Sequence, residues 1–327
     1  MAAPLTTNAH RATIEPVGTD VRRPTWSVMI PTYNCATTLG ETLRSVLEQD
    51  LGPDQMQIEV VDDASERDDP EAVVRDLGGG RVGFFRQAQN VGLVRNFATC
   101  LQRSRGHYIH LLHGDDFVLE GFYDALQSGF ERDPSVGAAF CRWMIVDDAS
   151  NLLTIAEPRQ GHAGELIDAA VHLATEQHIV TPSIAVRRSV YELLGGFDER
   201  LECAEDWEMW VRIAASFTVW YEPSLLAAYR SHPDSNTGRH HRLAEELRYT
   251  AMVIDMMTAY LPPDRAAQVV RTARRNYART AVDNAKQFIA AGDREAARAH
   301  LRTAVELSRS PGILREVAKL LPRVVWP

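Results

Sequence analysis

Residues 57–65 read QIEVVDDAS, an apolar run that passes directly into two adjacent aspartates, and residues 108–116 repeat the arrangement as YIHLLHGDD. Short apolar runs that end in turn residues are typical of buried strands. Two more strands are expected at residues 26–30 and 82–85, with helices at 38–48, 70–77 and 91–104. This alternation predicts a parallel α/β sheet with crossover helices. Ligands bind at the carboxyl ends of such strands, so both acidic pairs lie where a ligand site is expected.

The remaining chain is less regular. A longer strand is expected at 138–146, shorter strands at 184–186 and 219–221, and a helix at 206–214. From about residue 242 onward nearly every segment favours helix. We therefore expect a disordered lead over residues 1–24, a catalytic domain over 25–235 and a helical region over 236–327.

Composition restricts the class of protein. The chain has 327 residues, of which 45% are hydrophobic and 24% charged, with a formal net charge of −9. This acidic balance disfavours non-specific nucleic-acid binding, although a bound cation can still attract a phosphate ligand. No run is long enough to cross a bilayer, and residues 1–23 lack the apolar stretch of a signal peptide. The cysteines show no CxxC spacing and fit a reduced, cytoplasmic setting: Cys35, Cys100, Cys141 and Cys203.

The last segment, residues 313–326, is amphipathic and carries Arg315, Lys319 and Arg323. Such a helix can lie on the inner face of a membrane as a peripheral contact. Packing against the catalytic domain or a second subunit is the favoured alternative, and the oligomeric state stays open.

Asp115 and Asp116 carry the first chemical indication. Adjacent carboxylates behind a buried strand repel each other unless a cation or hydrogen-bond donors compensate. Magnesium or manganese would supply that compensation and leave positions for phosphate oxygens. The alternative is a turn in which an aspartate caps a helix that begins at Phe117.

The other polar candidates each have an equally simple structural interpretation. Asp63 can accept hydrogen bonds from a ribose or a base, or it can belong to an ordinary capped loop. Asp206 can act as a general base, or it can stabilise the start of its helix. Arg95 can pair with a diphosphate and His232 with a metal or phosphate, or both can be plain surface residues. No Walker A loop, Gly-x-Ser-x-Gly or Gly-x-Gly-x-x-Gly is present.

Taken together, the motifs resemble those of family-2 glycosyltransferases with the GT-A fold. The resemblance covers about residues 25–235. The matching segments, in chain order, are VMIPTYN (28–34), VVDDAS (60–65), NVGLVRN (90–96), LHGDD (112–116), GGFD (195–198) and EDWEMW (205–210).

The resemblance implies a Rossmann-like mixed α/β sheet flanked by helices, here with a C-terminal helical extension. It implies an inverting hexosyl- or N-acetylhexosaminyl-transferase that uses a nucleoside-diphosphate sugar, usually a UDP-sugar, and Mn²⁺ or Mg²⁺ in polysaccharide or glycoconjugate biosynthesis. Ala64 stands where the family usually has glycine, a change that we expect to be tolerated. The residues carried over to nucleotide-sugar binding are Pro31, Tyr33, Asn34, Asp63, Asn90, Arg95 and Asp115.

The same resemblance assigns the reactive groups. Asp206 matches the catalytic base, with Glu205 as its substitute. Asp116 is preferred over Asp115 as the direct metal ligand, and His232 is a further candidate. The acceptor stays open among a glycan, a lipid-linked sugar, a protein and a metabolite.

Two rival functions share some of these features. A nucleotidyltransferase needs a glycine-rich basic loop after the first strand, whereas residues 32–35 read TYNC and no lysine or arginine follows before Arg44. A non-catalytic sugar-nucleotide-binding protein or scaffold would not need Asp206 together with both members of the acidic pair.

Overall fold

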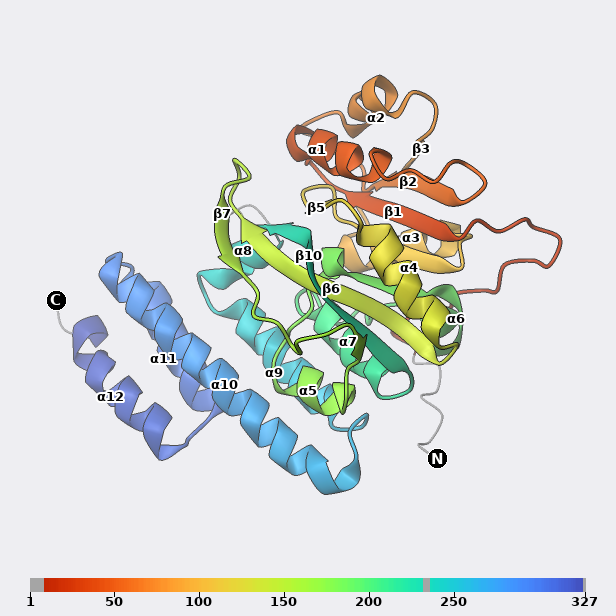
Figure 1. Cartoon of the computed structure of the whole chain (residues 1–327). Coiled ribbons are helices and arrows are strands. Elements are labelled where there is room, and N and C mark those ends of the chain that lie inside the picture. Colours follow the sequence, from red (N-terminus) through yellow and green to blue (C-terminus); the bar gives the residue numbers. More distant parts are fainter. Residues whose placement is uncertain (1–8, 232–235, 326–327) are drawn as a thin grey trace. The chain divides into compact units, whose positions relative to one another are not determined.

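The computed structural model describes residues 9–231 and 236–325 (Figure 1). These residues form two compact units. The sheet unit holds residues 9–167, 179–200 and 216–231, and the helical unit holds 168–178, 201–215 and 236–325. Two segments inside the expected 25–235 domain, 168–178 and 201–215, thus group with the C-terminal helices.

One half of the sheet is parallel, as the sequence predicts. It contains β1 (Trp26–Thr32), β2 (Met56–Asp62), β3 (Gly83–Arg86) and β4 (Tyr108–Leu111). β1 pairs in parallel with β2 and β4, and β2 pairs in parallel with β3. Both acidic pairs therefore follow strands that border β1.

The other half makes the sheet mixed, which confirms the expected fold class. β9 (Ile184–Arg187) runs antiparallel to both β4 and β6 (Val136–Val146). β10 (Thr218–Arg230) lies parallel to β6 and is far longer than the predicted 219–221, with register shifts between Glu222 and Ala227. Polar residues and a proline interrupt its apolar pattern, which hid its length. The order is β3-β2-β1-β4-β9-β6-β10-β5, and the short strands are β5 (Phe117–Val118), β7 (Leu152–Ile155) and β8 (Gly164–Glu165).

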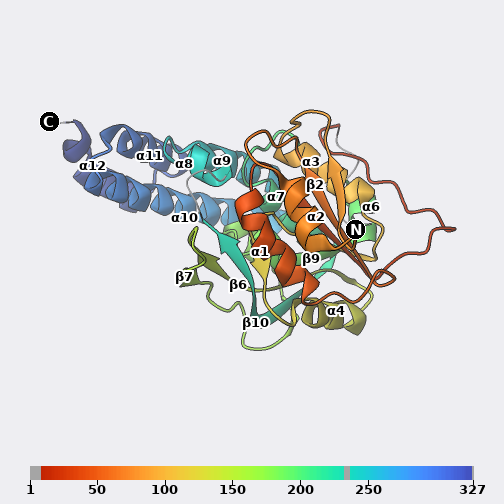
Figure 2. The same ribbon diagram turned by 90° about the horizontal axis from the view of Figure 1, so that it is seen from above.

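Helices cover both faces of the sheet. α1 (Ala36–Leu47), α2 (Pro70–Gly78) and α4 (Phe122–Arg132) share one core with the β1 side chains Trp26, Val28 and Ile30. α1 and α2 lie side by side (Figure 2). α3 (Leu93–Arg103) packs against β1, β2 and β4, where Phe97 meets Phe197. Short turns η1 (Thr181–Ser183) and α6 (Arg188–Leu194) flank β9.

The expected disordered lead is wrong for residues 9–24, which the structure places on the sheet unit. Arg11 forms a bridge with Asp198, and Ile14 is buried. The Nε atom of Arg11 lies 3.5 Å from Oδ2 of Asp198, whose side chain is fully buried. This ion pair and the buried isoleucine act together with hydrogen bonds to the carbonyls of His10, Ala12 and Glu15. None of these contacts has a periodic pattern that a sequence reveals.

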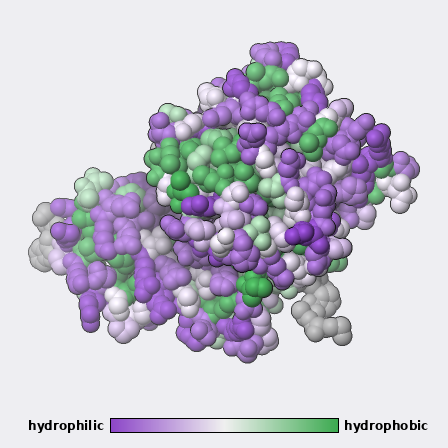
Figure 3. Space-filling view, viewed as in Figure 1, coloured by the Kyte–Doolittle hydropathy of each residue, from purple (hydrophilic) through white to green (hydrophobic). Residues whose placement is uncertain are grey.

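β7 is an exposed strand with an apolar surface. Leu152, Leu153 and Ile155 are all exposed. Hydrophobic side chains gather around this strand on the face shown in Figure 3.

The helical unit confirms the expected C-terminal helices. Its members are α5 (Ala169–Thr175), α7 (Glu205–Ala214), α8 (Asn236–His241), α9 (Glu245–Met257), α10 (Pro263–Ala290), α11 (Arg294–Leu307) and α12 (Pro311–Val325). Alanines line the contact between α10 and α11, where small side chains let two helices approach closely. In the described part of the chain, no helix combines the length and hydrophobicity of a membrane span.

Candidate active site

The Asp115–Asp116 turn follows β4 and is buried at Asp116, which is 1% exposed. Its Oδ1 atom accepts a hydrogen bond from the Arg230 backbone N–H at 2.8 Å. Its Oδ2 atom is buried and receives no hydrogen bond of good geometry from the described residues, although Nδ1 of His113 lies 3.3 Å away. Burial, followed by the charge of Asp115, raises the pKa of Asp116 to about 6. Burial therefore makes the ionised form of this carboxylate energetically costly.

Helix α1 fixes the backbone of this turn. Thr38 Oγ1 donates to the Gly114 carbonyl at 3.0 Å, and Thr42 Oγ1 donates to the Asp116 carbonyl at 2.7 Å. A Cβ atom at Gly114 would lie 2.6 Å from both Cys35 Sγ and a Thr32 methyl group. The glycine is therefore needed for close approach to the end of β1.

Arg230, at the end of β10, is a positioning residue that the sequence did not reveal. Its side chain is 1% exposed. Nε donates to the Asp115 carbonyl at 2.8 Å, and Nη2 donates to Glu41 Oε2 at 2.6 Å. The guanidinium also binds the carbonyls of Asp147 and Asp148. Since these partners lie between 82 and 189 residues away along the chain, no local motif marks it.

His113, Asp115 and Asp116 form a candidate metal site. Each offers a ligand atom, and these atoms lie within 4.8 Å of one another. The buried Oδ2 atom of Asp116 is a carboxylate oxygen for which the described part of the chain supplies no hydrogen bond. Two carboxylates suit Mg²⁺ and Mn²⁺. The residues therefore fit a divalent cation. The sequence motif contains His113 but does not mark it as a ligand. The other expected ligand, His232, lies outside the described residues.

Asp62 is the last residue of β2 and Asp63 follows it, and the protein itself supplies both carboxylates with donors. Asp62 Oδ2 accepts from Arg86 Nε at 2.7 Å and from the Ser65 N–H at 3.1 Å. The two oxygens of Asp63 accept from the N–H groups of Val91 at 2.8 Å and Gly92 at 2.9 Å. Each Asp63 oxygen keeps one further lone pair, which a ligand hydroxyl can use.

Asn34, in the turn after β1, binds the turn after β2 through hydrogen bonds. Asn34 lies in the left-handed region with φ 54°, and its Oδ1 accepts from the N–H groups of Glu66 and Arg67 at 3.0 Å each. Pro31 is buried beside it, whereas Tyr33 is 38% exposed. The structure thus brings the turns after β1 and β2 together and leaves one aromatic ring accessible.

Asn90 lies three residues before α3 and Arg95 lies in its first turn, and both are exposed. Arg95 Nε donates to Glu199 Oε2 at 3.1 Å. This pair is solvent-exposed and contributes little to stability.

The expected base, Asp206, belongs to the helical unit and lies in the first turn of α7. Its Oδ2 accepts from Gln177 Nε2 at 2.8 Å, and its Oδ1 accepts from the Trp207 N–H at 2.7 Å. The Gln177 N–H in turn donates to the Tyr277 hydroxyl at 3.1 Å. Glu205, its neighbour, is buried. Gln177 orients the Asp206 carboxylate, and no sequence motif pointed to it.

Comparison with known proteins finds relatives that match about two thirds of this chain. An uncharacterized protein of Mycobacterium tuberculosis is 30% identical over 234 residues, which cover 68% of this chain and 72% of that protein. An uncharacterized glycosyltransferase of Rickettsia typhi is 24% identical over 218 residues, which cover 65% of this chain and 66% of that protein.

Solved structures share the fold. Staphylococcus aureus TarS 1-349, in complex with UDP-GlcNAc, matches with a TM-score of 0.67 and 14% identity over 92% of this chain and 89% of that chain. The mannosyltransferase PcManGT from Pyrobaculum calidifontis, in complex with GDP-Man and Mn²⁺, matches with a TM-score of 0.59 and 19% identity over 96% of this chain and 85% of that chain. These likenesses show the GT-A fold. The family model described as glycosyl transferase family 2 matches residues 27–194, just over half of the chain, so this protein belongs to that family of glycosyltransferases.

Proposed function

We propose that this glycosyltransferase moves a sugar from a nucleoside-diphosphate sugar to an acceptor hydroxyl, with a divalent cation and with inversion at the anomeric carbon. The observation that carries the proposal is the buried Asp116 Oδ2 atom beside Asp115 and His113, which accepts no hydrogen bond of good geometry within residues 9–231 and 236–325. TarS was solved with UDP-GlcNAc and PcManGT with GDP-Man and Mn²⁺. These ligands support the donor class, with a UDP-sugar as the first choice.

Asp116, Asp115 and His113 would hold the cation, and His232 remains a candidate. A divalent cation bound there supplies positive charge to the diphosphate as it leaves. The chain's own contribution is orientation, because Arg230 and the threonines of α1 fix the turn before any ligand arrives. Asp63, with Tyr33, would hold the ribose and the base, and Arg95 the diphosphate.

Asp206 is the proposed general base. It takes the proton of the acceptor hydroxyl while that oxygen forms a bond to the anomeric carbon. The bond from that carbon to the diphosphate oxygen breaks on the opposite face, and the nucleoside diphosphate departs with the electron pair. Gln177 donates to one oxygen of Asp206 and thereby sets the direction of its free lone pairs.

Removing the base tests this assignment. Asp206→Asn should lower turnover by about 100- to 10,000-fold, because general-base catalysis contributes that much. Nucleotide binding in the presence of Mn²⁺, measured by calorimetry, should change little. The matched control is Asp264→Asn, an exposed carboxylate in the first turn of α10. Near-normal turnover of Asp206→Asn would refute the base.

The donor is identified by thermal shift against UDP-GlcNAc, UDP-glucose and GDP-mannose, each with and without Mn²⁺. A ligand that binds only the folded protein raises its melting temperature, so the true donor gives the largest shift. Release of nucleoside diphosphate from that donor then reports chemistry. Incorporation of a nucleoside triphosphate would instead indicate a nucleotidyltransferase, and binding without turnover a non-catalytic protein.

Contact with a membrane also belongs to this proposal. α12 buries Val317, Leu320 and Val324 within the helical unit and exposes Leu314 and Leu321. Its basic residues Arg315, Lys319 and Arg323 are exposed as well. Sedimentation with anionic vesicles would test a peripheral site at the inner membrane face, where a lipid-linked acceptor would be available.

A further inference from the structure

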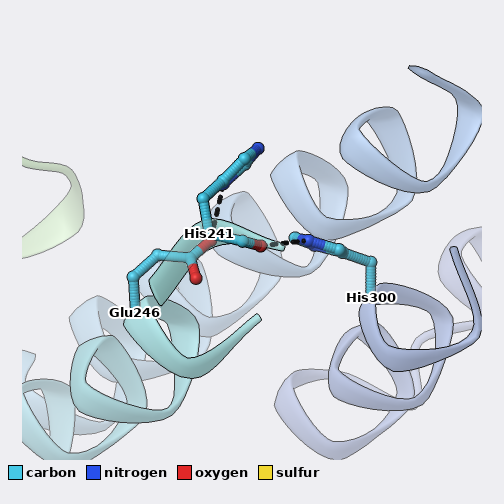
Figure 4. Close-up of side chains that lie close together, drawn as sticks. All are labelled: His241, Glu246 and His300. Atoms are coloured by element: carbon cyan, nitrogen blue, oxygen red, sulfur yellow. Dashed lines mark hydrogen bonds and ion pairs between the residues drawn. The ribbon is translucent and has the colours of Figure 1, made fainter. Parts of the chain in front are cut away.

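The helical unit contains a second cluster of metal-ligating side chains. His241 ends α8, Glu246 lies in the first turn of α9, and His300 lies within α11. Each offers a ligand atom, and these atoms lie within 4.8 Å of one another. Figure 4 shows Glu246 beside the His241 ring and the His300 ring directed at the His241 carbonyl, which lies 59 residues away along the chain.

His300 is fully buried and has a defined tautomer. Its Nε2 atom lies 2.8 Å from the His241 carbonyl oxygen, which can only accept, so Nε2 carries the proton. Nδ1 therefore holds a lone pair. That atom is buried and has no hydrogen-bond partner among the residues that the structure covers. A buried acceptor without a donor costs free energy, and its presence calls for an explanation.

Glu246 presents a second acceptor of the same kind. Its Oε1 atom lies 3.0 Å from His241 Nδ1. Its Oε2 atom is buried and likewise lacks a partner among the described residues. Glu246 and His300 thus each bury a lone pair that meets no donor within residues 9–231 and 236–325. A bound cation would remove the free-energy cost of burying these lone pairs.

The surroundings resemble the outer shell of a metal site. Histidines that bind metals usually donate their other ring N–H to a carbonyl or carboxylate, as His300 does to His241. Phe288 stacks on the His300 ring, with centroids 5.1 Å apart, and contacts His241 at 5.5 Å. An aromatic wall of this kind limits the access of water on one side.

We propose that His241, Glu246 and His300 bind one divalent transition-metal cation of the zinc class. Two imidazoles and one carboxylate match the preference of Zn²⁺ for nitrogen ligands, whereas Mg²⁺ prefers oxygen alone. His241 binds as the neutral ring, with its proton on the nitrogen that does not face the ion. The fourth position is left to water. The ion cross-links the α8–α9 connection to α11, and this role does not depend on the proposed sugar transfer.

Zinc titration tests the site. The parent is the full chain with Asp116→Asn, which weakens the other candidate metal site. After treatment with a chelator, it should bind one Zn²⁺ per chain in competition with a chromogenic chelator. His241→Gln and Glu246→Gln should each weaken binding by more than the roughly 10- to 100-fold that loss of an outer-shell partner costs. Zn²⁺ should raise the melting temperature of the parent but not of these variants.

His240→Gln is the matched control. His240 pairs with Glu245 through Nδ1 at 2.9 Å, as His241 pairs with Glu246, but it lies outside the cluster. It should keep the affinity of the parent. No zinc binding by the parent, or equal affinity in all variants, would overturn the proposal. A glutamine variant that loses its circular-dichroism signal has not folded. In that case the Co²⁺ absorption spectrum of the parent tests the site. A tetrahedral band supports the site, and its absence rejects it.

Discussion

The two aspartate pairs of the sheet unit share a sequence pattern and differ in what surrounds them. Asp62 ends β2 and Asp63 follows it. Six groups donate to this pair: the Ser65 N–H and hydroxyl, Arg86 Nε and the Thr32 hydroxyl to Asp62, and the Val91 and Gly92 N–H groups to Asp63. Asp116 follows β4 and receives one backbone N–H, while its other oxygen is buried, lies 3.3 Å from His113 Nδ1 and receives no hydrogen bond of good geometry from the residues that the structure describes.

This difference indicates two tasks. A carboxylate whose lone pairs are met by protein donors holds a loop in place. A buried carboxylate that lacks donors needs a cation before it can ionise at low cost. We therefore assign the first pair to structure and to nucleotide contact through its spare lone pairs, and the second pair to the metal.

The largest expected effect comes from neutralising the second pair. Asp116→Asn keeps the acceptor for the Arg230 N–H but removes the charge that holds the cation. Mn²⁺-dependent release of nucleoside diphosphate should fall by at least about 100-fold, the scale of losing one preorganised electrostatic contact in a transition state. Asp124→Asn, which alters an exposed carboxylate in the same unit, is the control. Unchanged metal dependence in Asp116→Asn would end the distinction between the pairs.

Neutralising the first pair should instead affect folding. Asp62 is fully buried, and Asp62→Asn places an amide where Arg86 and Ser65 need an acceptor. The free energy of unfolding should fall by about 2–3 kcal/mol, the range for charged hydrogen bonds. Urea denaturation measures it. The exposed Asp76, paired with Arg75, offers a control in which Asp76→Asn changes stability by less than about 0.5 kcal/mol.

The pH dependence of the metal-free protein sharpens the comparison further. The pKa of Asp116 is raised to about 6 in the folded state, chiefly by burial, from an ordinary 3.8. Between these values the unfolded chain has released this proton and the native state keeps it, so stability falls as pH rises from about 4 to about 6. With a chelator present, Asp116→Asn should therefore be more stable than the parent at pH 8 by on the order of 2 kcal/mol, and equal to it near pH 4.

Added Mn²⁺ should reverse that order at pH 8, because only the parent binds it. Thermal melts of the parent and of Asp116→Asn at pH 4 and pH 8, each with chelator and with Mn²⁺, give the four conditions that this comparison needs. A parent as stable as Asp116→Asn at pH 8 without metal would show that the burial of this carboxylate carries no penalty.

How far the sequence predicts this site follows from the range of its contacts. Strands and their acidic ends could be predicted because each signal lies within about ten residues of chain. The donors of Asp63 are backbone N–H groups 28 and 29 residues away, and the N–H donor of Asp116 comes from Arg230, 114 residues away. Backbone donors have no residue-type signature, so sequence could not tell which pair was satisfied.

The helical unit shows the same limit. His241 and His300 are 59 residues apart and have none of the short spacings that mark zinc sites in sequence. Gln177 meets Asp206 across 29 residues, in a segment for which only a general role in shaping the site was expected. Only the packing of helices brings these groups together.

The smallest expected effect concerns the turn after the first pair. Ala64 has φ 57°, in the left-handed region that suits glycine, and it stands where the resembling family usually has glycine. Ala64→Gly relieves that strain but adds freedom to the unfolded chain, so we expect a net gain of only about 0.5 kcal/mol in unfolding free energy. The second pair demands glycine for another reason, because Gly114 needs space beside Cys35 and Thr32 rather than a positive φ. Ala64→Gly should therefore leave metal binding at Asp116 unchanged while raising the melting temperature slightly. A loss of stability in Ala64→Gly would show that the Asp62 and Asp63 hydrogen bonds, rather than backbone preference, already set this turn.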